Sequence, residues 1–146
     1  MSDPNGRKRA LDVLASASAK ALAEKWDLFS DKPDFVSVRG PETGMVMVRG
    51  RAGGGGAAFN LGEATVSRAS VRIASGEVGH GYCLGRDLDK ARVIAVIDAL
   101  YQRDSETIEA EFIAPLEAVR REDDVQRRAE TAATKVDFFT MVRGDD

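Results

Sequence analysis

The sequence predicts an α+β fold, in which a mainly antiparallel sheet of about four strands packs with an N-terminal helix and C-terminal helices. Apolar residues recur at three- and four-residue steps before residue 30 and again after residue 87, as in amphipathic helices. Between these regions the chain is rich in valine and alternates between apolar and polar residues, as half-buried strands do. Short turn-like segments separate the strand-like runs, which favours an antiparallel meander.

The first expected element is helical, begins at Asp3-Pro4 and ends near Ser30. Aspartate is a favoured N-cap, and proline is tolerated in the first helical turn. The apolar spacing fits one helix of about seven turns or two shorter helices. Pro33 ends the region, because the residue before a proline avoids the helical conformation. The residues that share the expected apolar face are Leu11, Leu14, Ser18, Leu22, Trp26 and Phe29.

The middle third is expected to form the sheet. Its first two strands read as a β-hairpin, because a segment rich in turn-forming residues joins them. The expected strands are Phe35–Arg39, Met45–Arg51, Thr65–Ala74 and Val78–Gly85, with the first turn at Gly40–Gly44.

Alternation within these strands separates two faces. Val46 and Val48 are expected on the core side of their strand, which sends the arginines of that strand to the opposite face. In the next strand Val71 and Ile73 share the apolar face, and Arg68 and Arg72 lie opposite. The last strand is expected to place its glycines on one face and its larger side chains on the other. Those larger residues are Val78, His80, Tyr82 and Leu84.

The remaining chain is expected to be mainly helical. Asp87 caps a segment that continues to about Arg103, Ser105 begins a short segment, and Pro115 opens a helix that ends near Lys135. Thr107–Ile113 fits either a helix or a strand. The length suits one domain over residues 1–146, divided into a helical N-terminus (1–30), a meander (35–85), helices (87–135) and an apolar tail (136–146).

The composition argues against several functions. Cys83 and His80 are the only residues of their types, too few for an internal disulfide or a transition-metal centre. A net charge of -3 and a pI near 5.3 are unlike those of a general nucleic-acid binder. No apolar run approaches the ~20 residues that cross a bilayer, and polar residues interrupt the N-terminal segment where a signal peptide would be apolar. We therefore expect a cytoplasmic protein that binds neither nucleic acid nor membrane.

The glycine run Gly53–Gly56 invites comparison with phosphate-binding loops. A nucleotide P-loop needs a lysine and a hydroxyl residue directly after its last glycine, whereas Ala57 and Ala58 follow here. The run is predicted to be a flexible connection between strands. A second interpretation is that its bare backbone lets a partner protein or a phosphate approach closely.

Arginines concentrate on or beside the predicted strands, and the planar guanidinium group suits carboxylate and phosphate ligands. They could form a solvated outer face in which Glu42 and Glu63 are surface partners, or a contact surface for another subunit or an anionic substrate. The candidate partner or anion contacts are Arg49, Arg51, Asn60, Glu63, Arg68, Arg72 and Arg86.

No catalytic residue or metal ligand is predicted. Glu63 could act as a general base and His80 as an acid or base, but spacing identifies no partner for either. A structural role for His80 is favoured. Nucleophilic roles for Cys83 and Ser67 are weaker, because one histidine supports no recognisable triad.

The C-terminal tail is apolar for a segment that follows a charged helix. It could complete the protein's own sheet or pack into a partner, since aromatic residues and methionine are frequent interface anchors. The candidate tail interface consists of Phe138, Phe139, Met141 and Arg143.

Several blocks along nearly the whole chain resemble the PhnG family, the G subunit of the bacterial carbon–phosphorus lyase core complex. The blocks are PETGMVMVRGR, FNLGEATVSR, GHGYCLGRD and ETAATKVDFFTMVRG, and they occur in the family's order. The FNLGEATVSR block could be an interface element or a structural corner.

The resemblance implies a role in phosphonate catabolism beside PhnH, PhnI and PhnJ subunits. With PhnH, PhnI and PhnL, the family supports transfer of the ribose 5-triphosphate part of ATP to methylphosphonate, with release of adenine. The PhnJ subunit cleaves the carbon–phosphorus bond with an iron–sulfur cluster and S-adenosylmethionine. This chain has too few cysteines for such a cluster, so it is expected to bind no cofactor itself. The alternatives are a self-sufficient small enzyme that binds a phosphorylated substrate on an arginine-bearing sheet, and a single-strand nucleic-acid module.

Overall fold

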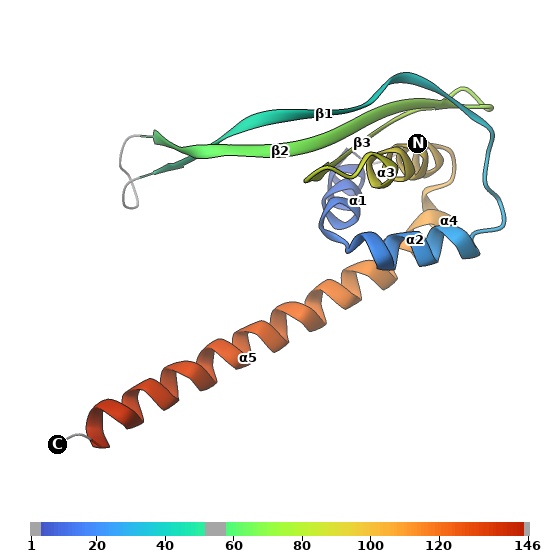
Figure 1. The fold of residues 1–146 in the computed structure, drawn as a ribbon. Helices are drawn as coiled ribbons and strands as arrows, with labels where there is room; N and C mark the ends of the chain where they lie inside the picture. Colours follow the sequence, from blue (N-terminus) through green and yellow to red (C-terminus); the bar gives the residue numbers. More distant parts are fainter. Residues whose placement is uncertain (1–3, 52–57, 145–146) are drawn as a thin grey trace.

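A three-stranded antiparallel sheet forms one layer of the molecule, and the helices lie on one side of it (Figure 1). The computed structural model describes the backbone of residues 4–51 and 58–144 and the side chains of residues 5–47 and 62–133. The elements are, in order, α1 (Pro4–Ser16), α2 (Ala19–Leu28), β1 (Phe35–Arg51), β2 (Ala58–Ile73), β3 (Val78–Leu84), α3 (Leu88–Arg103), α4 (Ser105–Ile108), a π-helical turn η1 (Glu109–Ile113) and α5 (Ala114–Gly144).

The predicted α+β class is confirmed, but the sheet has three strands in the order β1-β2-β3 rather than four. The segment Gly40–Gly44, expected to be a turn, lies inside the 17-residue strand β1. Register shifts after Ser37 and Arg39 take up extra residues of β1, and pairing with β2 then continues. Such bulges bend a strand without ending it, so one strand replaces the expected hairpin. The glycine run Gly53–Gly56 lies outside the described residues.

The N-terminal region forms two helices, which decides between the alternatives that its spacing left open. Ser18 separates them and caps α2, because its Oγ accepts a hydrogen bond from the N–H of Ala21 at 3.1 Å. At the end of α2 the ring of Trp26 lies 5.9 Å from that of Phe29, which in turn lies 5.2 Å from the ring of Phe112. This aromatic group joins α2 to η1 at the bottom of the core.

Helix α3 packs directly on the inner face of β2 and β3, and two glycines allow its close approach. A Cβ at Gly79 would lie 2.6 Å from the backbone nitrogen of Ala99, and one at Gly81 would lie 2.5 Å from that of Ala95. Any larger residue would therefore push the helix away from the sheet. The predicted alternation of β3 is confirmed, since its glycines are buried and its larger side chains lie on the other face.

The other element boundaries agree largely with expectation. Asp87 caps α3, and its carboxylate accepts a hydrogen bond from the N–H of Lys90 at 3.0 Å. The ambiguous segment Thr107–Ile113 is helical, with a π-helical turn in its second part. Helix α5 continues past the expected end at Lys135, so the backbone of residues 136–144 extends this helix and does not join the sheet.

Two arms extend beyond the layered part of the molecule (Figure 1). One is the outer half of the β1–β2 hairpin, where Met45 is 64% and Met47 is 58% exposed. The other is α5, whose 31 residues span about 46 Å at the usual helical rise. Among the described residues, no helix combines the length and the apolar character required to cross a membrane.

The expectation that Val46 faces the core is wrong. Val46 pairs with Ala64 and, by register, lies on the same side of the sheet as Glu42 and Arg68, away from α3. Its exposed fraction is 43%. Simple alternation separated Val46 correctly from Met45, but it does not tell which of the two faces of the strand the helices cover. The side chain of Val48 lies outside the described set.

Candidate functional site

A groove of about 700 Å³ lies between α1, the end of β3 and the first turns of α5. Apolar side chains contribute part of its lining, and charged side chains of both signs contribute the rest. Its lining residues are Asn5, Lys8, Arg9, Asp12, Val13, Ala15, Ser16, Val66, Tyr82, Cys83, Leu84, Glu117 and Arg120.

Arg9 holds the lower wall of this groove together. Its guanidinium group donates to Glu117 at 2.7 Å and to Glu109 of η1. The hydrogen bond from Arg9 lowers the pKa of Glu117, and the two carboxylates raise the pKa of Arg9. The arrangement fixes the start of α5 against α1, so it determines where the free part of α5 points.

Tyr82 closes the upper wall. Its hydroxyl donates to the carboxylate of Asp12 at 3.0 Å, which connects β3 to α1. Burial raises the pKa of Tyr82, and the hydrogen bond to Asp12 adds to this shift. Tyr82 is therefore a protonated donor at neutral pH rather than a base.

Ser67 and Cys83, the two weakly supported nucleophiles, support the turn between β3 and α3. Ser67 is fully buried, and its Oγ donates to the carbonyl of Gly85 at 2.6 Å and accepts from the N–H of Asp87 at 3.0 Å. The Cys83 thiol donates to the carbonyl of Asp87 at 3.6 Å, and burial raises its pKa. A buried thiol with a raised pKa is a poor nucleophile. These contacts favour the structural-corner interpretation of the FNLGEATVSR block at Ser67.

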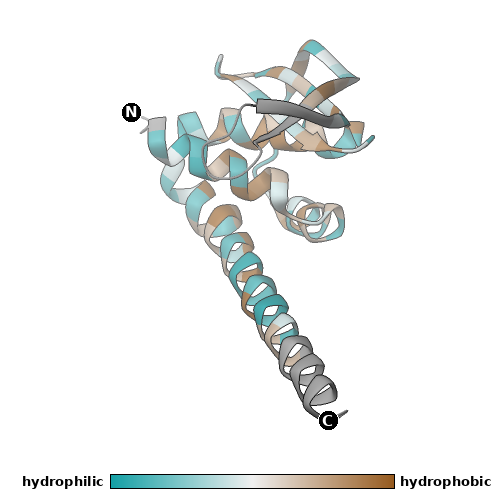
Figure 2. Ribbon diagram, turned by 90° about the vertical axis from the view of Figure 1, so that its left-hand side faces the viewer, coloured by the Kyte–Doolittle hydropathy of each residue, from teal (hydrophilic) through white to brown (hydrophobic). Residues whose placement is uncertain are grey.

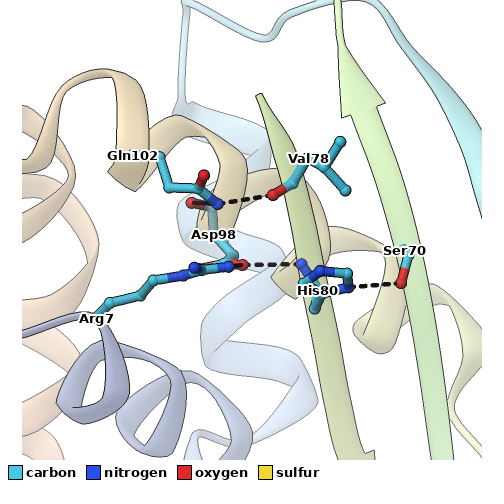
Figure 3. A network of polar contacts seen from close by, with 6 residues as sticks. All are labelled: Arg7, Ser70, Val78, His80, Asp98 and Gln102. Atoms are coloured by element: carbon cyan, nitrogen blue, oxygen red, sulfur yellow. Dashed lines mark hydrogen bonds and ion pairs between the residues drawn. The ribbon is translucent and has the colours of Figure 1, made fainter. Parts of the chain in front are cut away.

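A buried carboxylate connects α1, α3 and β3 (Figure 3). Asp98 is 2% exposed and accepts two hydrogen bonds from Arg7, both at 2.8 Å. It also accepts from the backbone N–H of His80 at 2.8 Å. The imidazole Nδ1 of His80 lies 2.7 Å from the hydroxyl of Ser70 on the outer face of the sheet. Both contacts of His80 are to neighbouring elements of the fold, as a structural role requires.

The outer edge of β3 is covered in one half and open toward the groove in the other. Gln102 donates to the carbonyl of Val78 at 2.7 Å, and Asp98 accepts from the N–H of His80. Unpaired strand edges attract other chains, and side chains that occupy their hydrogen-bonding groups prevent this. Beyond His80 the edge borders the groove at Tyr82 and Leu84, and Leu84 is 76% exposed.

The predicted arginine surface is divided rather than gathered into one site. Arg68 donates to Glu42 at 3.0 Å, and Arg39 lies 3.2 Å from the same carboxylate. The proposed surface partnership of Glu42 is therefore present. Arg72 and Arg86 are exposed at separate places, one on β2 and the other in the connection between β3 and α3.

The other candidates lie on the two arms. The backbones of Arg49 and Asn60 pair across the hairpin, Arg51 pairs with Ala58, and the exposed Glu63 pairs with Met47. The side chains of Arg49, Arg51 and Asn60 lie outside the described set, as do those of the tail candidates. The tail candidates are Phe138, Phe139, Met141 and Arg143, and their backbone belongs to α5.

Sequence reasoning missed the groove and its polar contacts. Arg9 and Asp12 read only as polar positions on a helix, and their partners Glu109, Glu117 and Tyr82 are distant in the sequence. Within the described part of the chain, no group of three or more His, Cys, Asp or Glu side chains is arranged to hold a metal ion. The groove is open, has an apolar part and carries charges of both signs at its margin. Protein–protein contact surfaces have the same combination of an apolar centre and a polar rim.

Comparison with known proteins identifies the family. Residues 5–144 match the family described as phosphonate metabolism protein PhnG. A protein of Rhizobium meliloti (strain 1021), named alpha-D-ribose 1-methylphosphonate 5-triphosphate synthase subunit PhnG, is 53% identical over 141 residues, which is 96% of this chain and 90% of that protein. The resemblance carried by the four sequence blocks is thus confirmed over almost the whole length. The chain belongs to the PhnG family of phosphonate metabolism proteins.

Proposed function

We propose that this chain is the G subunit of an alpha-D-ribose 1-methylphosphonate 5-triphosphate synthase and acts in the catabolism of organic phosphonates. The observation that carries the proposal is the 53% identity to a subunit of that synthase, which extends over 96% of the chain. In this role the chain supports transfer of the ribose 5-triphosphate part of ATP to methylphosphonate, with release of adenine.

The shape of the molecule supports a role as a subunit. The chain exposes 9811 Å², whereas a compact monomer of 15.7 kDa exposes about 7,300 Å². The excess of about 2,500 Å² is roughly what three contacts of standard size would bury on one partner. The hairpin arm and α5 contribute to this excess, because both extend away from the core with exposed side chains (Figure 1).

The contacts of the sheet give the alternative of a self-sufficient enzyme little support. That alternative depends on arginines free to bind a phosphorylated substrate, and Arg68 is held by Glu42. Ser67 and Cys83 are occupied at the turn before α3. We therefore assign the chemistry of the complex to other subunits.

The proposed partners are the PhnH, PhnI, PhnJ and PhnL subunits, in the cytoplasm. The complex would bind ATP, and the PhnJ subunit would carry the iron–sulfur cluster and use S-adenosylmethionine. The present chain would bind none of these cofactors and would serve assembly or the positioning of catalytic subunits.

Purification of the complex with and without this chain tests the proposal. The chain should co-purify with the other subunits, and adenine release from ATP and methylphosphonate should require its presence. The isolated chain should release no adenine. The proposal is wrong if the remaining subunits have full activity without the chain, or if the pure chain catalyses the reaction and a mutation within it abolishes turnover.

A further inference from the structure

Helix α5 leaves the body of the protein soon after it begins. Leu116 is 3% exposed and is part of the core, whereas every described side chain from Ala118 to Ala133 is exposed. An isolated helix is only marginally stable in water, because most helical stability in proteins comes from packing of an apolar face. A free helix of this length therefore requires a surface to pack against.

One side of α5 carries a continuous apolar stripe. Val125, Ala129 and Ala132 are exposed and follow one another at four- and three-residue steps. The same spacing continues in the sequence through Val136 and Phe139. Alternating steps of three and four place residues along one seam, as in helices that pair side by side. Figure 2 shows apolar positions recurring along this otherwise hydrophilic helix. Val125, Ala129 and Ala132 are called the α5 stripe below.

Charges are distributed unequally beside the α5 stripe. Arg121 and Arg128 are seven residues apart and form a basic row along one flank, where Arg121 also donates to Glu117 at 2.9 Å. Lys135 continues the seven-residue spacing in the sequence. The corresponding positions on the other flank are uncharged. Those positions are Val119, Gln126 and Ala133.

We propose that the α5 stripe is the docking surface for an amphipathic helix of another subunit. The partner helix would place large apolar side chains over Ala129 and Ala132, where small residues let two helices approach closely. Acidic residues of the partner would face the basic row, as paired helices commonly match flanking charges. The proposal rests on the proposed function, because it names the chemistry of a contact within that complex.

A second copy of this chain fits the same surface less well. In an antiparallel pair of α5 helices the two basic rows would face each other and repel. In a parallel pair each basic row would face the uncharged flank and gain no ion pair. An acidic partner satisfies the basic row in either orientation, which is why we assign the surface to a different protein.

Two neighbouring arginines provide a matched test of the charge assignment. Arg128 belongs to the basic row, whereas Arg127 points about 100° away around the helix. Both are exposed in the structure. In the complex purified from co-expressed subunits, Arg128→Glu should weaken binding of this chain by about tenfold or more, and Arg127→Glu should leave it nearly unchanged.

A second pair of variants tests the stripe itself. The double substitution Ala129→Glu with Ala132→Glu places two charges on the stripe, and Thr131→Glu with Thr134→Glu places the same charges on the far side of α5. Only the first pair should prevent co-purification. Circular dichroism of each free variant checks that the helix content is unchanged, which is expected because none of the described positions among these four is buried.

The outcomes separate this inference from the proposed function. If the unmodified chain does not co-purify with the other subunits, the proposed function fails, and this inference fails with it. If the unmodified chain assembles, and the Arg128→Glu variant and the Ala129→Glu/Ala132→Glu variant assemble equally well, the function stands and the stripe is not the contact. Concentration-dependent dimerisation of the free chain, abolished by the stripe variant, would assign the surface to a second copy and overturn the inference.

Discussion

At the scale of single residues, Asp98 should be the polar side chain whose loss costs most. It is 2% exposed and satisfies both Arg7 and the N–H of His80. Asp98→Asn weakens the two charge-assisted hydrogen bonds from Arg7, whose side chain is 32% exposed, so the free energy of unfolding should fall by about 1.5–3 kcal/mol. Urea denaturation would measure the change.

Asp89 is the matched control for this substitution. It lies on the same helix, and its side chain is 92% exposed. Asp89→Asn should change stability by no more than about 0.5 kcal/mol. Equal effects of the two substitutions would show that the network around Asp98 contributes little.

Gly81 should tolerate no side chain, because a Cβ there would meet backbone atoms of Ala91 and Ala95. Gly81→Ala must move α3 away from the sheet, and we expect the free energy of unfolding to fall by about 3 kcal/mol. Gly44→Ala is the control in the same sheet, since its nearest heavy atom would be Arg68 Nη2 at 3.6 Å. It should be neutral or slightly stabilising, and thermal unfolding of both variants would contradict the argument if their midpoints were equal.

The structural roles of some residues could be predicted from their sequence neighbours, and the roles of others could not. Asp87 was predicted correctly as a cap, because the evidence for a cap lies within a few residues of it. Asp98 read as one polar position on a helix, and its partner Arg7 is 91 residues away. Its role depends on α1 and α3 lying side by side, which periodicity does not show.

At the scale of elements, the extent of strand β1 was set by its pairing with β2 rather than by its local sequence pattern. The Gly-Pro sequence at Gly40 and Pro41 has the composition of a turn, so a hairpin was expected there. In the structure β1 keeps pairing with β2 on both sides of this point. Hydrogen bonds to the long strand β2 stabilise β1 through the Gly-Pro segment. The sequence of β1 alone does not show how long β2 is.

Arg49 and Arg51 of the hairpin arm should be dispensable for folding. Arg49 and Arg51 belong to the part of β1 that extends past the helices (Figure 1). Replacing both with alanine should change the free energy of unfolding by no more than about 0.5 kcal/mol per site. We expect assembly of the complex to be impaired instead. A collapsed melting temperature with normal assembly of the folded fraction would make these arginines structural.

The ion pair between Arg9 of α1 and Glu117 of α5 should contribute less stability in acid. Arg9 lowers the pKa of Glu117 below its usual value of 4.5, so the folded state binds this proton less readily than the unfolded state. The resulting stability is present above about pH 4.5 and is lost as the pH falls through the lowered pKa. Because these groups are partly exposed, the effect should be at most about 1 kcal/mol.

The variant Glu117→Gln tests the contribution of this ion pair. The variant should show a weaker dependence of unfolding free energy on pH between about pH 5 and pH 3 than the unmodified chain. An identical dependence in both proteins would mean that the ion pair does not contribute. Added salt should reduce the difference, because it screens exposed charges.

At the scale of the whole molecule, the separated chain should be more extended than its length suggests. A compact chain of 146 residues has a radius of gyration of about 15 Å. Two projecting arms should raise the value measured by small-angle scattering clearly above this. A value near 15 Å for the monomer would mean that the hairpin and α5 fold back onto the core in solution.

The exposed α5 should also shorten the lifetime of an unassembled chain in a cell. A helix that lacks tertiary packing opens locally at a low free-energy cost, and four exposed arginines lie along its first half. They are Arg120, Arg121, Arg127 and Arg128. Proteases that recognise basic residues would cut there until another protein covers the helix, and a cut chain would lose the part that carries the α5 stripe. Degradation and assembly would therefore compete for the same segment, and this competition would limit the amount of free subunit to what its proposed partners can capture.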